Sequence, residues 1–414
     1  MVLCYNPDNM KSKWLTLGLL CLAYFFYMSD RMLFGLLVVP IQKETGLSDL
    51  QIGSIDTVVY WTIALLAPVA GVLGDRFPRP RIITCAVVLW GLFTALTGFV
   101  GGIVGFIAVR AVLLTAAQSF YGPSAYAFIA SEHKETRTAA LSIHEGAMYV
   151  GMLLCGVIVA ALLGRFGSWR SVYYAYGLAT LSVGLVIGVC CWRAGGVTAS
   201  AKKSFAVGMR TFFGNPAALC VGSGFVAILF ASSGFAVWAP KYMALKFGLT
   251  VGEAARGVMF WPNVAAMTAA IGGGFLTDAL VRKFPRVRLV IYMSVFLAAV
   301  PVLAAIGYLP CLPLVWGAFV LFGLLRGLYI ANSKAALFDV IPPECRASSV
   351  GFLNIIACFV SSLAPVSIGY ASHRWGLAGF EFSFAAMGGL LVVAAALSWI
   401  AYRFLFARYR VVES

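Results

Sequence analysis

The chain has 414 residues, of which 62% are hydrophobic and 11% are charged, and its formal net charge at pH 7 is +15. About a quarter of the residues of a soluble domain are charged, so this composition excludes a soluble globular protein and indicates a membrane protein. The basic residues are dispersed over short polar segments and do not gather on one face, which argues against a nucleic-acid-binding protein.

Apolar runs of about twenty residues recur along the chain, and each is long enough to cross a hydrocarbon core of about 30 Å as a helix. The first run follows Lys11 and Lys13, but it contains Asp30 and Arg31 and lacks a small-residue cleavage site, so we expect a retained helix and not a signal peptide. We predict twelve membrane-spanning helices, which begin near Trp14, Leu50, Ile82, Val104, Thr138, Ser171, Pro216, Ala254, Arg288, Leu312, Ser348 and Phe380.

The distribution of Lys and Arg predicts the orientation of these helices. If the amino terminus is cytoplasmic, most basic residues outside the apolar runs lie on the cytoplasmic side, as in residues 76–81, 202–210 and 282–288. The positive-inside rule therefore places both termini in the cytoplasm. We expect an integral multi-pass protein of a bacterial inner membrane.

A repeated pattern predicts two similar halves. Gly46 follows the first span and Gly71-x-x-x-Asp75 follows the second, and the same features return at Gly248 and Gly274, which stand 202 and 203 residues further along. Parallel halves of this kind expose a site at the membrane midplane alternately to each side.

The predicted domains are an N-terminal six-helix bundle at residues 1–193, a cytoplasmic linker at residues 194–214, and a C-terminal six-helix bundle at residues 215–414. The linker is polar and basic, and we expect an amphipathic helix within it on the inner membrane surface.

The segment GVLGDRFPRPR, residues 71–81, resembles the Gly-x-x-x-Asp-Arg-x-Gly-Arg-Arg pattern that follows helix 2 in the major facilitator superfamily. Pro78 and Pro80 depart from that pattern. Together with the twelve-span layout, the resemblance implies the major facilitator fold, an all-α membrane protein of two six-helix pseudo-symmetric halves. In the family this loop latches the cytoplasmic side in the outward-open state, so the resemblance implies a gating role for Gly71, Asp75, Arg76, Arg79 and Arg81.

The first half is also similar to the spinster branch and to the organic anion:cation symporters. The features that carry this similarity are the pair Asp30-Arg31 late in the first helix, an Ile-Gln before a GLSD turn, and an Ala-Pro-Val before the Gly-Asp-Arg loop. Such relatives often have an acidic residue on helix 4 after its Arg, where this chain has Ala117 and Gln118. The fifth helix lacks the Gly-Pro signature of proton-coupled drug antiporters, which argues against drug efflux.

Charged side chains inside the predicted spans point to the function. A charge near the centre of a bilayer is costly, so it faces protein or a water-filled cavity and marks a pathway or relay. Each one also has a structural interpretation, as an ion pair between helices or as a side chain that reaches the membrane surface. The candidates are Asp30 and Arg31 in the first helix, Arg110 in the fourth, His144 and Glu145 in the fifth, and Arg326 and Lys334 in the tenth.

Helical spacing brings aromatic and amide side chains onto the faces that carry these arginines, and the bases outnumber the acids. The planar fork of Arg binds a carboxylate or phosphate through two hydrogen bonds, so we predict an organic anion as the substrate. The aromatic side chains also fit an ordinary helix core. The predicted substrate-binding residues are Arg31, Arg110, Arg326, Tyr27, Gln118, Tyr121 and Tyr329.

Asp30 is the first candidate for the residue that couples transport to a proton, with Glu145 second and His144 third. Burial opposes the ionisation of Asp30, whereas the neighbouring guanidinium of Arg31 favours it. An anion bound to that guanidinium removes part of the charge that stabilises the carboxylate, so proton and anion bind together. Lys334 is assigned to the gate, where we expect it to pair with Glu145 across the halves when the cytoplasmic side closes.

We therefore expect a secondary active transporter that moves a small organic anion by alternating access, with proton-coupled symport preferred over sodium coupling. One alternative is a spinster-like transporter of a lysolipid or sphingoid anion. A membrane receptor or enzyme is the alternative from another class, but the sequence has no nucleotide-binding loop, HExxH motif or Gly-x-Ser-x-Gly nucleophile elbow. We expect a monomer with no enzyme activity, cofactor, metal or nucleic-acid partner, and the direction of transport stays open.

Overall fold

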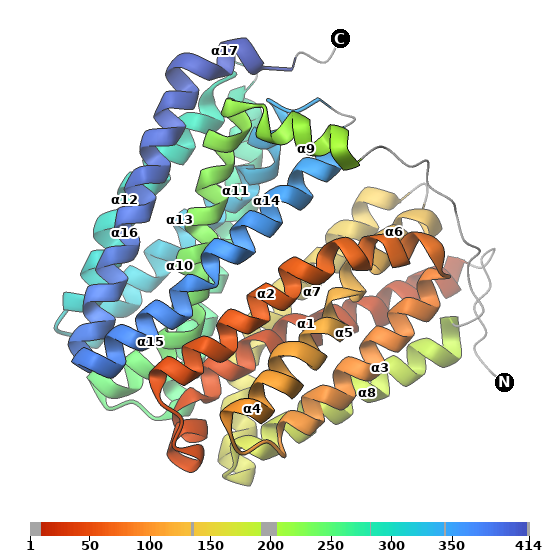
Figure 1. The fold of residues 1–414 in the computed structure, drawn as a ribbon, viewed down its shortest axis with the longest axis vertical. Coiled ribbons are helices and arrows are strands. Elements are labelled where there is room, and N and C mark those ends of the chain that lie inside the picture. The colour runs from red at the N-terminus through yellow and green to blue at the C-terminus, as the bar shows by residue number, and fades with distance from the viewer. Residues whose placement is uncertain (1–9, 134–135, 192–204, 282, 343–344, 412–414) are drawn as a thin grey trace. The chain divides into compact units, whose positions relative to one another are not determined.

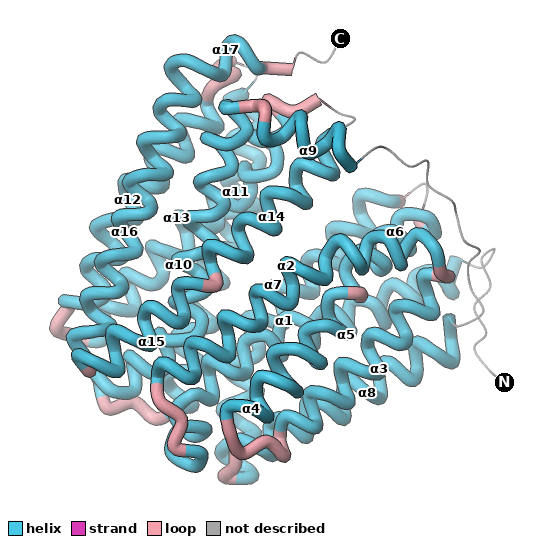
Figure 2. Tube along the Cα trace, viewed as in Figure 1, coloured by secondary structure: helices cyan, strands magenta, loops and turns pink. Residues whose placement is uncertain are grey.

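The computed structural model describes residues 10–133, 136–191, 205–281, 283–342 and 345–411 (Figure 1). In this described part every regular element is a helix, and loops join the helices (Figure 2). Among the described residues, twelve segments are long and apolar enough to cross a membrane. The prediction of an all-α membrane protein with twelve spanning helices is therefore confirmed.

The chain forms two compact units, Met1–Ala201 with Leu249–Arg256, and Lys202–Gly248 with Gly257–Ser414. Residues 194–204 of the predicted linker lie outside the described residues. Helix α9 (Phe205–Phe213) occupies most of the rest of that segment.

The first unit is built mainly from the helices that form the first six spans. Helix α3 packs along α8, and α1 packs along α7. The bounds are α1 Met10–Thr45, α2 Asp49–Arg76, α3 Arg79–Thr97, α4 Ile103–Gly105, the π-helix η1 Phe106–Leu114, α5 Thr115–Ser119, α6 Tyr121–Glu132, α7 Arg137–Phe166 and α8 Trp169–Cys191.

The second unit follows the same plan with the last six spans. Here α12 packs along α16, and α10 packs against α14 and α16. The bounds are α10 Pro216–Phe247, α11 Val251–Val281, α12 Val287–Tyr308, α13 Leu312–Phe338, α14 Arg346–Ser361, α15 Leu363–Trp375, α16 Leu377–Ile400, the π-helix η3 Ala401–Leu405 and α17 Phe406–Tyr409.

Two of the predicted spans are interrupted, and a proline accounts for each interruption. Proline has no N–H, and its ring clashes with the carbonyl group four residues earlier. Pro123 lies four residues after Ser119, where α5 ends, and Pro365 lies four residues after Ser361, where α14 ends. The carbonyl oxygen of Ser361 instead accepts a hydrogen bond of 2.9 Å from Ser233 Oγ. A side chain thus satisfies a backbone group that the bilayer cannot hydrate.

The turns after the first and seventh spans repeat each other in detail. Gly46 and Gly248 have φ values of 69° and 66° and follow the last residues of α1 and α10. A left-handed conformation at this position favours glycine. Ser48 then forms a capping box with Gln51 at the start of α2, and Thr250 makes the equivalent bonds with the residue three positions later. The sequence repeat therefore corresponds to a repeated local structure.

Helices α3 and α8 approach so closely that glycine is required at their contact. A Cβ atom on Gly177 of α8 would lie 2.3 Å from the backbone nitrogen of Ala95, and one on Gly91 of α3 would lie 2.5 Å from that of Leu181. Small residues at such contacts let membrane helices pack through their backbones.

We expect Gly177→Ala to lower the free energy of unfolding by about 1–3 kcal/mol, because the added methyl group forces the two backbones apart. The melting temperature of the purified protein in detergent measures this change. Gly18→Ala is the matched control, since no atom lies within 4 Å of a Cβ built there. Equal melting temperatures for the two variants would contradict the proposed contact.

Candidate functional site

The side chain of Asp30 is buried in the first unit, and three donors converge on one of its oxygens. Trp90 Nε1 lies 3.1 Å and Thr94 Oγ1 lies 3.2 Å from Oδ2, and Gln118 Nε2 lies 2.9 Å from the same atom. Trp90 and Thr94 are one turn apart on α3 and therefore share a face. The other oxygen, Oδ1, receives no hydrogen bond from any residue in the described part of the chain. The carboxyl group is thus held rigidly with one oxygen open.

A second buried acid, Asp56 on α2, pairs with Arg110. The Oδ1 atom of Asp56 lies 3.4 Å from Nη2 of Arg110, and both side chains are at most 10% exposed. The guanidinium carbon of Arg110 lies 4.0 Å from the centre of the Phe34 ring. Arg110 pairs with Asp56 and also acts electrostatically on the buried carboxyl group of Asp30, although the two side chains are not hydrogen-bonded.

The sequence analysis did not include Asp56 among the charges within the membrane, and this omission is corrected here. The bases still outnumber the acids, but Arg110 has an acidic partner within its own unit. Asp56 lies seven residues after Asp49, the first residue of α2, and acidic residues are common near the start of a helix. Its burial depends on the approach of η1, which no local pattern predicts.

Arg31 lies beside Asp30 on α1 and contacts two aromatic side chains. Its Nη1 atom donates a hydrogen bond of 3.4 Å to the hydroxyl of Tyr27. Its guanidinium carbon lies 5.9 Å from the Tyr27 ring centre and 6.0 Å from that of Tyr60. The side chain is only partly buried, in contrast to Arg110. Arg31 is therefore more accessible to a small molecule than Arg110 is.

His144 and Tyr121 form a hydrogen-bonded pair in the core of the first unit. The Tyr121 hydroxyl donates a bond of 2.7 Å to the carbonyl of Leu20 and lies 3.0 Å from Nε2 of His144. Since the hydroxyl has one hydrogen, this geometry assigns the proton of the neutral imidazole to Nε2. The ring of His144 stacks on Tyr24 at 4.4 Å, and its Nδ1 atom is buried with no partner among the described residues.

Glu145 is joined to the same aromatic cluster by a residue that the sequence analysis did not identify. Tyr126 donates a hydrogen bond of 2.5 Å to Glu145 Oε1, and its hydroxyl lies 3.0 Å from that of Tyr24. Tyr24 and Arg31 are seven residues apart on α1, or about 10 Å along its axis. Asp30 is next to Arg31, and Glu145 is linked to Tyr24 through Tyr126. Asp30 and Glu145 therefore belong to different parts of the unit, with Tyr27 between them.

In the second unit, Arg326 on α13 donates a hydrogen bond of 2.6 Å from Nη2 to Asn263 Oδ1 on α11. Tyr329 is buried, with ring centres 4.6 Å from Tyr292 and 5.1 Å from Phe296. Its ring belongs to the aromatic core of this unit. Lys334 is exposed two turns after Arg326.

The predicted gating residues lie at the junction of α2 and α3. The side chains of Gly71, Asp75 and Arg76 lie outside the described residues. Arg79 donates a hydrogen bond of 3.3 Å to the carbonyl of Ala127 on α6. The expected pairing of Lys334 with Glu145 concerns the two units relative to each other and stays a prediction.

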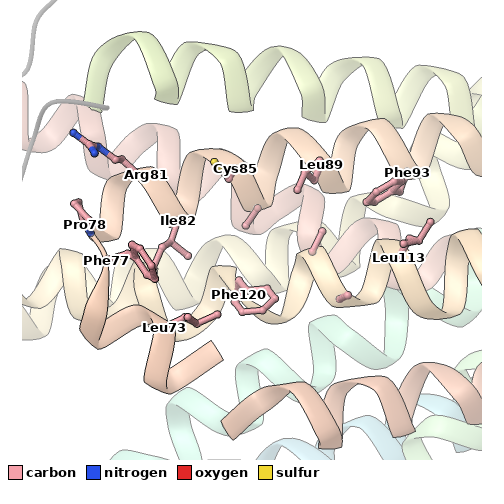
Figure 3. Close-up of a pocket in the computed structure, with 13 residues that line it drawn as sticks. Leu73, Phe77, Pro78, Arg81, Ile82, Cys85, Leu89, Phe93, Leu113 and Phe120 are labelled. Atoms are coloured by element: carbon pink, nitrogen blue, oxygen red, sulfur yellow. The ribbon is translucent and has the colours of Figure 1, made fainter. Parts of the chain in front are cut away.

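A large pocket of the first unit is apolar and lies away from these charges. It has a volume of about 550 Å³ and lies along α3, with Phe77 and Arg81 at one end and Phe93 and Leu113 at the other (Figure 3). None of the predicted substrate-binding residues lines it. Apart from Arg81, its walls have no charged side chain that could bind a compact anion. We therefore place the candidate site at Asp30, Asp56, Arg110 and Arg31 instead. In the described ranges no group of three His, Cys, Asp or Glu side chains could hold a metal ion.

Comparisons with known proteins identify the fold and the family. The profile described as Major Facilitator Superfamily matches residues 20–365. The probable sulfoacetate transporter SauU of Cupriavidus necator is 22% identical over 94% of each chain. Protein spinster of Drosophila melanogaster is 24% identical over 75% of this chain, and the match spans about half, 51%, of the Drosophila protein.

Among solved structures, the crystal structure of a bacterial homologue of the human lysosomal transporter spinster, inward-facing and unoccupied, matches with a TM-score of 0.86. The sequence identity is 20%, and the match covers 98% of this chain and 100% of that one. The predicted major facilitator fold and the resemblance to the spinster branch are confirmed.

We expect Asp56→Asn to lower the free energy of unfolding by about 3 kcal/mol, because it leaves the guanidinium of Arg110 buried without its acidic partner. Melting temperatures of Asp56→Asn, Arg110→Gln and the double variant measure the coupling. The double variant should lose less stability than the sum of the single variants. Additive losses would show that the two side chains do not stabilise each other.

Proposed function

Because the chain belongs to the Major Facilitator Superfamily, it is a membrane transporter and not an enzyme, and we propose that it moves a small organic anion together with a proton. Both termini are placed in the cytoplasm in this proposal, on the positive-inside rule. The observation that carries it is the buried guanidinium of Arg110, which is paired with Asp56 and acts electrostatically on a second buried carboxyl group, that of Asp30.

The charges of Asp30, Asp56 and Arg110 do not sum to zero when both acids are ionised. Asp30 and Asp56 together carry two negative charges when ionised, whereas Arg110 carries one positive charge. Arg31 is the second base whose charge acts on both acids. An anion bound to Arg31 offsets that charge, so a proton on one of the acids restores the balance. Because such coupling is reciprocal, protonation also favours binding of the anion.

Asp30 is the acid that we assign to the proton. Its Oδ2 atom accepts three hydrogen bonds, which fix the orientation of the carboxyl group. Its Oδ1 atom has no donor in the described part of the chain and can carry a proton without breaking any of them. Asp56 is paired with Arg110 through its own Oδ1 atom. Glu145 and His144 remain the second and third candidates, because they lie in the aromatic cluster further along α1.

The anion is assigned to Arg31 and Tyr27 in the first unit and to Arg326 in the second. Gln118, Tyr121 and Tyr329 already contact other protein groups, so in this proposal they position the charged residues. The similarity to a probable sulfoacetate transporter supports a compact organic anion as the first substrate to test.

The apolar pocket along α3 favours a second candidate, an amphipathic anion such as a lysolipid. Its walls suit an acyl chain, and Arg81 at one end suits an anionic headgroup. Uptake of labelled sulfoacetate and labelled lysophosphatidic acid by the same proteoliposomes decides between the two candidates. Uptake of lysophosphatidic acid alone would reject the small-anion proposal.

We expect Asp30→Asn to abolish accumulation of the anion driven by a pH gradient while counterflow exchange continues, because the neutral amide cannot carry the coupled proton. Radiolabelled substrate in proteoliposomes measures both activities. Glu253→Gln is the control, since this carboxylate is exposed and accepts its hydrogen bonds from Thr250 at the start of α11. A variant that still accumulates substrate under a pH gradient would place the proton elsewhere or show that sodium is the coupled ion.

We expect Arg31→Lys to weaken anion binding by about tenfold, because the point charge is kept but the two-pronged hydrogen bonding is lost. The melting temperature should not change, because Arg31 is only partly buried. Arg165→Lys on the exposed end of α7 is the control. Unchanged affinity in Arg31→Lys would remove Arg31 from the anion site.

A further inference from the structure

Lys334 is a cation within a membrane span for which the described part of the structure supplies no counter-ion. It lies on α13, four residues before the helix ends at Phe338. Other basic residues of the same unit have partners: Lys246 contacts Glu381, and Arg288 contacts Asp339. Lys334 makes no hydrogen bond, ion pair or ring contact with any described residue. An ammonium group without a counter-ion in the protein needs either water or an anion beside it.

A small pocket within the second unit adjoins this lysine. It has a volume of about 20 Å³ and lies between α10, α13 and α14. Its polar lining consists of Lys334, Ser333, Tyr329 and Asn354, and no acidic side chain contributes to it. The rest of the wall is apolar and includes Phe225 and Leu353.

The hydrogen-bonding groups of this lining make it a donor site. The Ser333 hydroxyl donates its hydrogen to the carbonyl of Ile330 at 2.9 Å. The amide of Asn354 is exposed and has no partner among the described residues. The ammonium group of Lys334 and the amide N–H groups of Asn354 therefore remain available to an acceptor. One positive charge with a neutral donor and no carboxylate suits an anion.

We propose that the pocket at Lys334 is a subsite for one compact oxyanion group, a carboxylate, sulfonate or phosphate, of the transported substrate. The volume is about that of a single water, so the pocket takes the end of a molecule and not a whole one. This inference rests on the proposed anion transport and places a recognition residue in the second unit. Lys334 is then a substrate contact, in addition to the gating role that the sequence suggested.

Protection of Lys334 from acetylation tests the pocket directly on the unmodified protein. The purified transporter is treated with an amine acetylating reagent in increasing sulfate, and peptide mass spectrometry measures the rate at each lysine. At twice the dissociation constant of sulfate, acetylation of Lys334 should slow by about threefold, because one third of the sites are then empty. The exposed Lys43 at the end of α1 is the internal control. Equal slowing at both lysines would overturn the site.

Transport kinetics test whether the bound group belongs to the substrate. Lys334→Met should raise the KM for sulfoacetate by about tenfold with kcat retained, and Lys334→Arg should restore most of it. Lys43→Met is the control. Protection by sulfate with an unchanged KM in Lys334→Met would reject the substrate contact. If the protein transports no anion, the proposed function fails while the protection result still decides whether the pocket binds an oxyanion.

Discussion

The hydrocarbon core of a bilayer does not solvate a charge, so a charged side chain that lies there needs a counter-charge, polar groups or a water-filled cavity within the protein. In the first unit this constraint is met by Arg110, which pairs with Asp56 and acts on Asp30 at the same time. The three residues join α1, α2 and η1, and the donors to Asp30 add α3 and α5. The charge cluster thus joins these five helices through polar contacts, while glycine contacts join α3 to α8 through their backbones.

The two units meet the same constraint differently. The first concentrates two acids and one arginine in a buried cluster and leaves Arg31 partly accessible beside aromatic rings. The second neutralises Lys246 and Arg288 with single carboxylates near the helix ends and holds Arg326 through a neutral amide. The acids proposed for the coupled proton therefore lie in the first unit. In that proposal, an anion that binds beside them favours one conformational state only by its difference in affinity for the two states.

Much of this structure was predictable from sequence, for physical reasons that also set the limits. Long apolar runs define the twelve spans because the bilayer fixes their length, and the recurrence of Gly46 at Gly248 indicated the repeat. The interruptions before Pro123 and Pro365 carried a local signal that a count of apolar residues does not use. The pairing of Asp56 with Arg110 and of Tyr126 with Glu145 carried none, because each pair joins separate helices. Sequence found most of the charges but not their partners.

The nine-residue π-helix that carries Arg110 has a consequence for how the fourth span can vary. Its backbone bonds reach one residue further than those of an α-helix, so it contains roughly one residue more than the same length of α-helix would. Loss of one residue anywhere between Phe106 and Leu114 could restore an ordinary helix of nearly the same length. The α-helical turns on either side would keep the directions that they face, because the extra residue is accommodated within the π-helix itself. Gln118 would still face Asp30, and the change would fall on residues inside the segment, such as Arg110. Length variation in relatives at this point would therefore alter polar contacts without moving the ends of the helix.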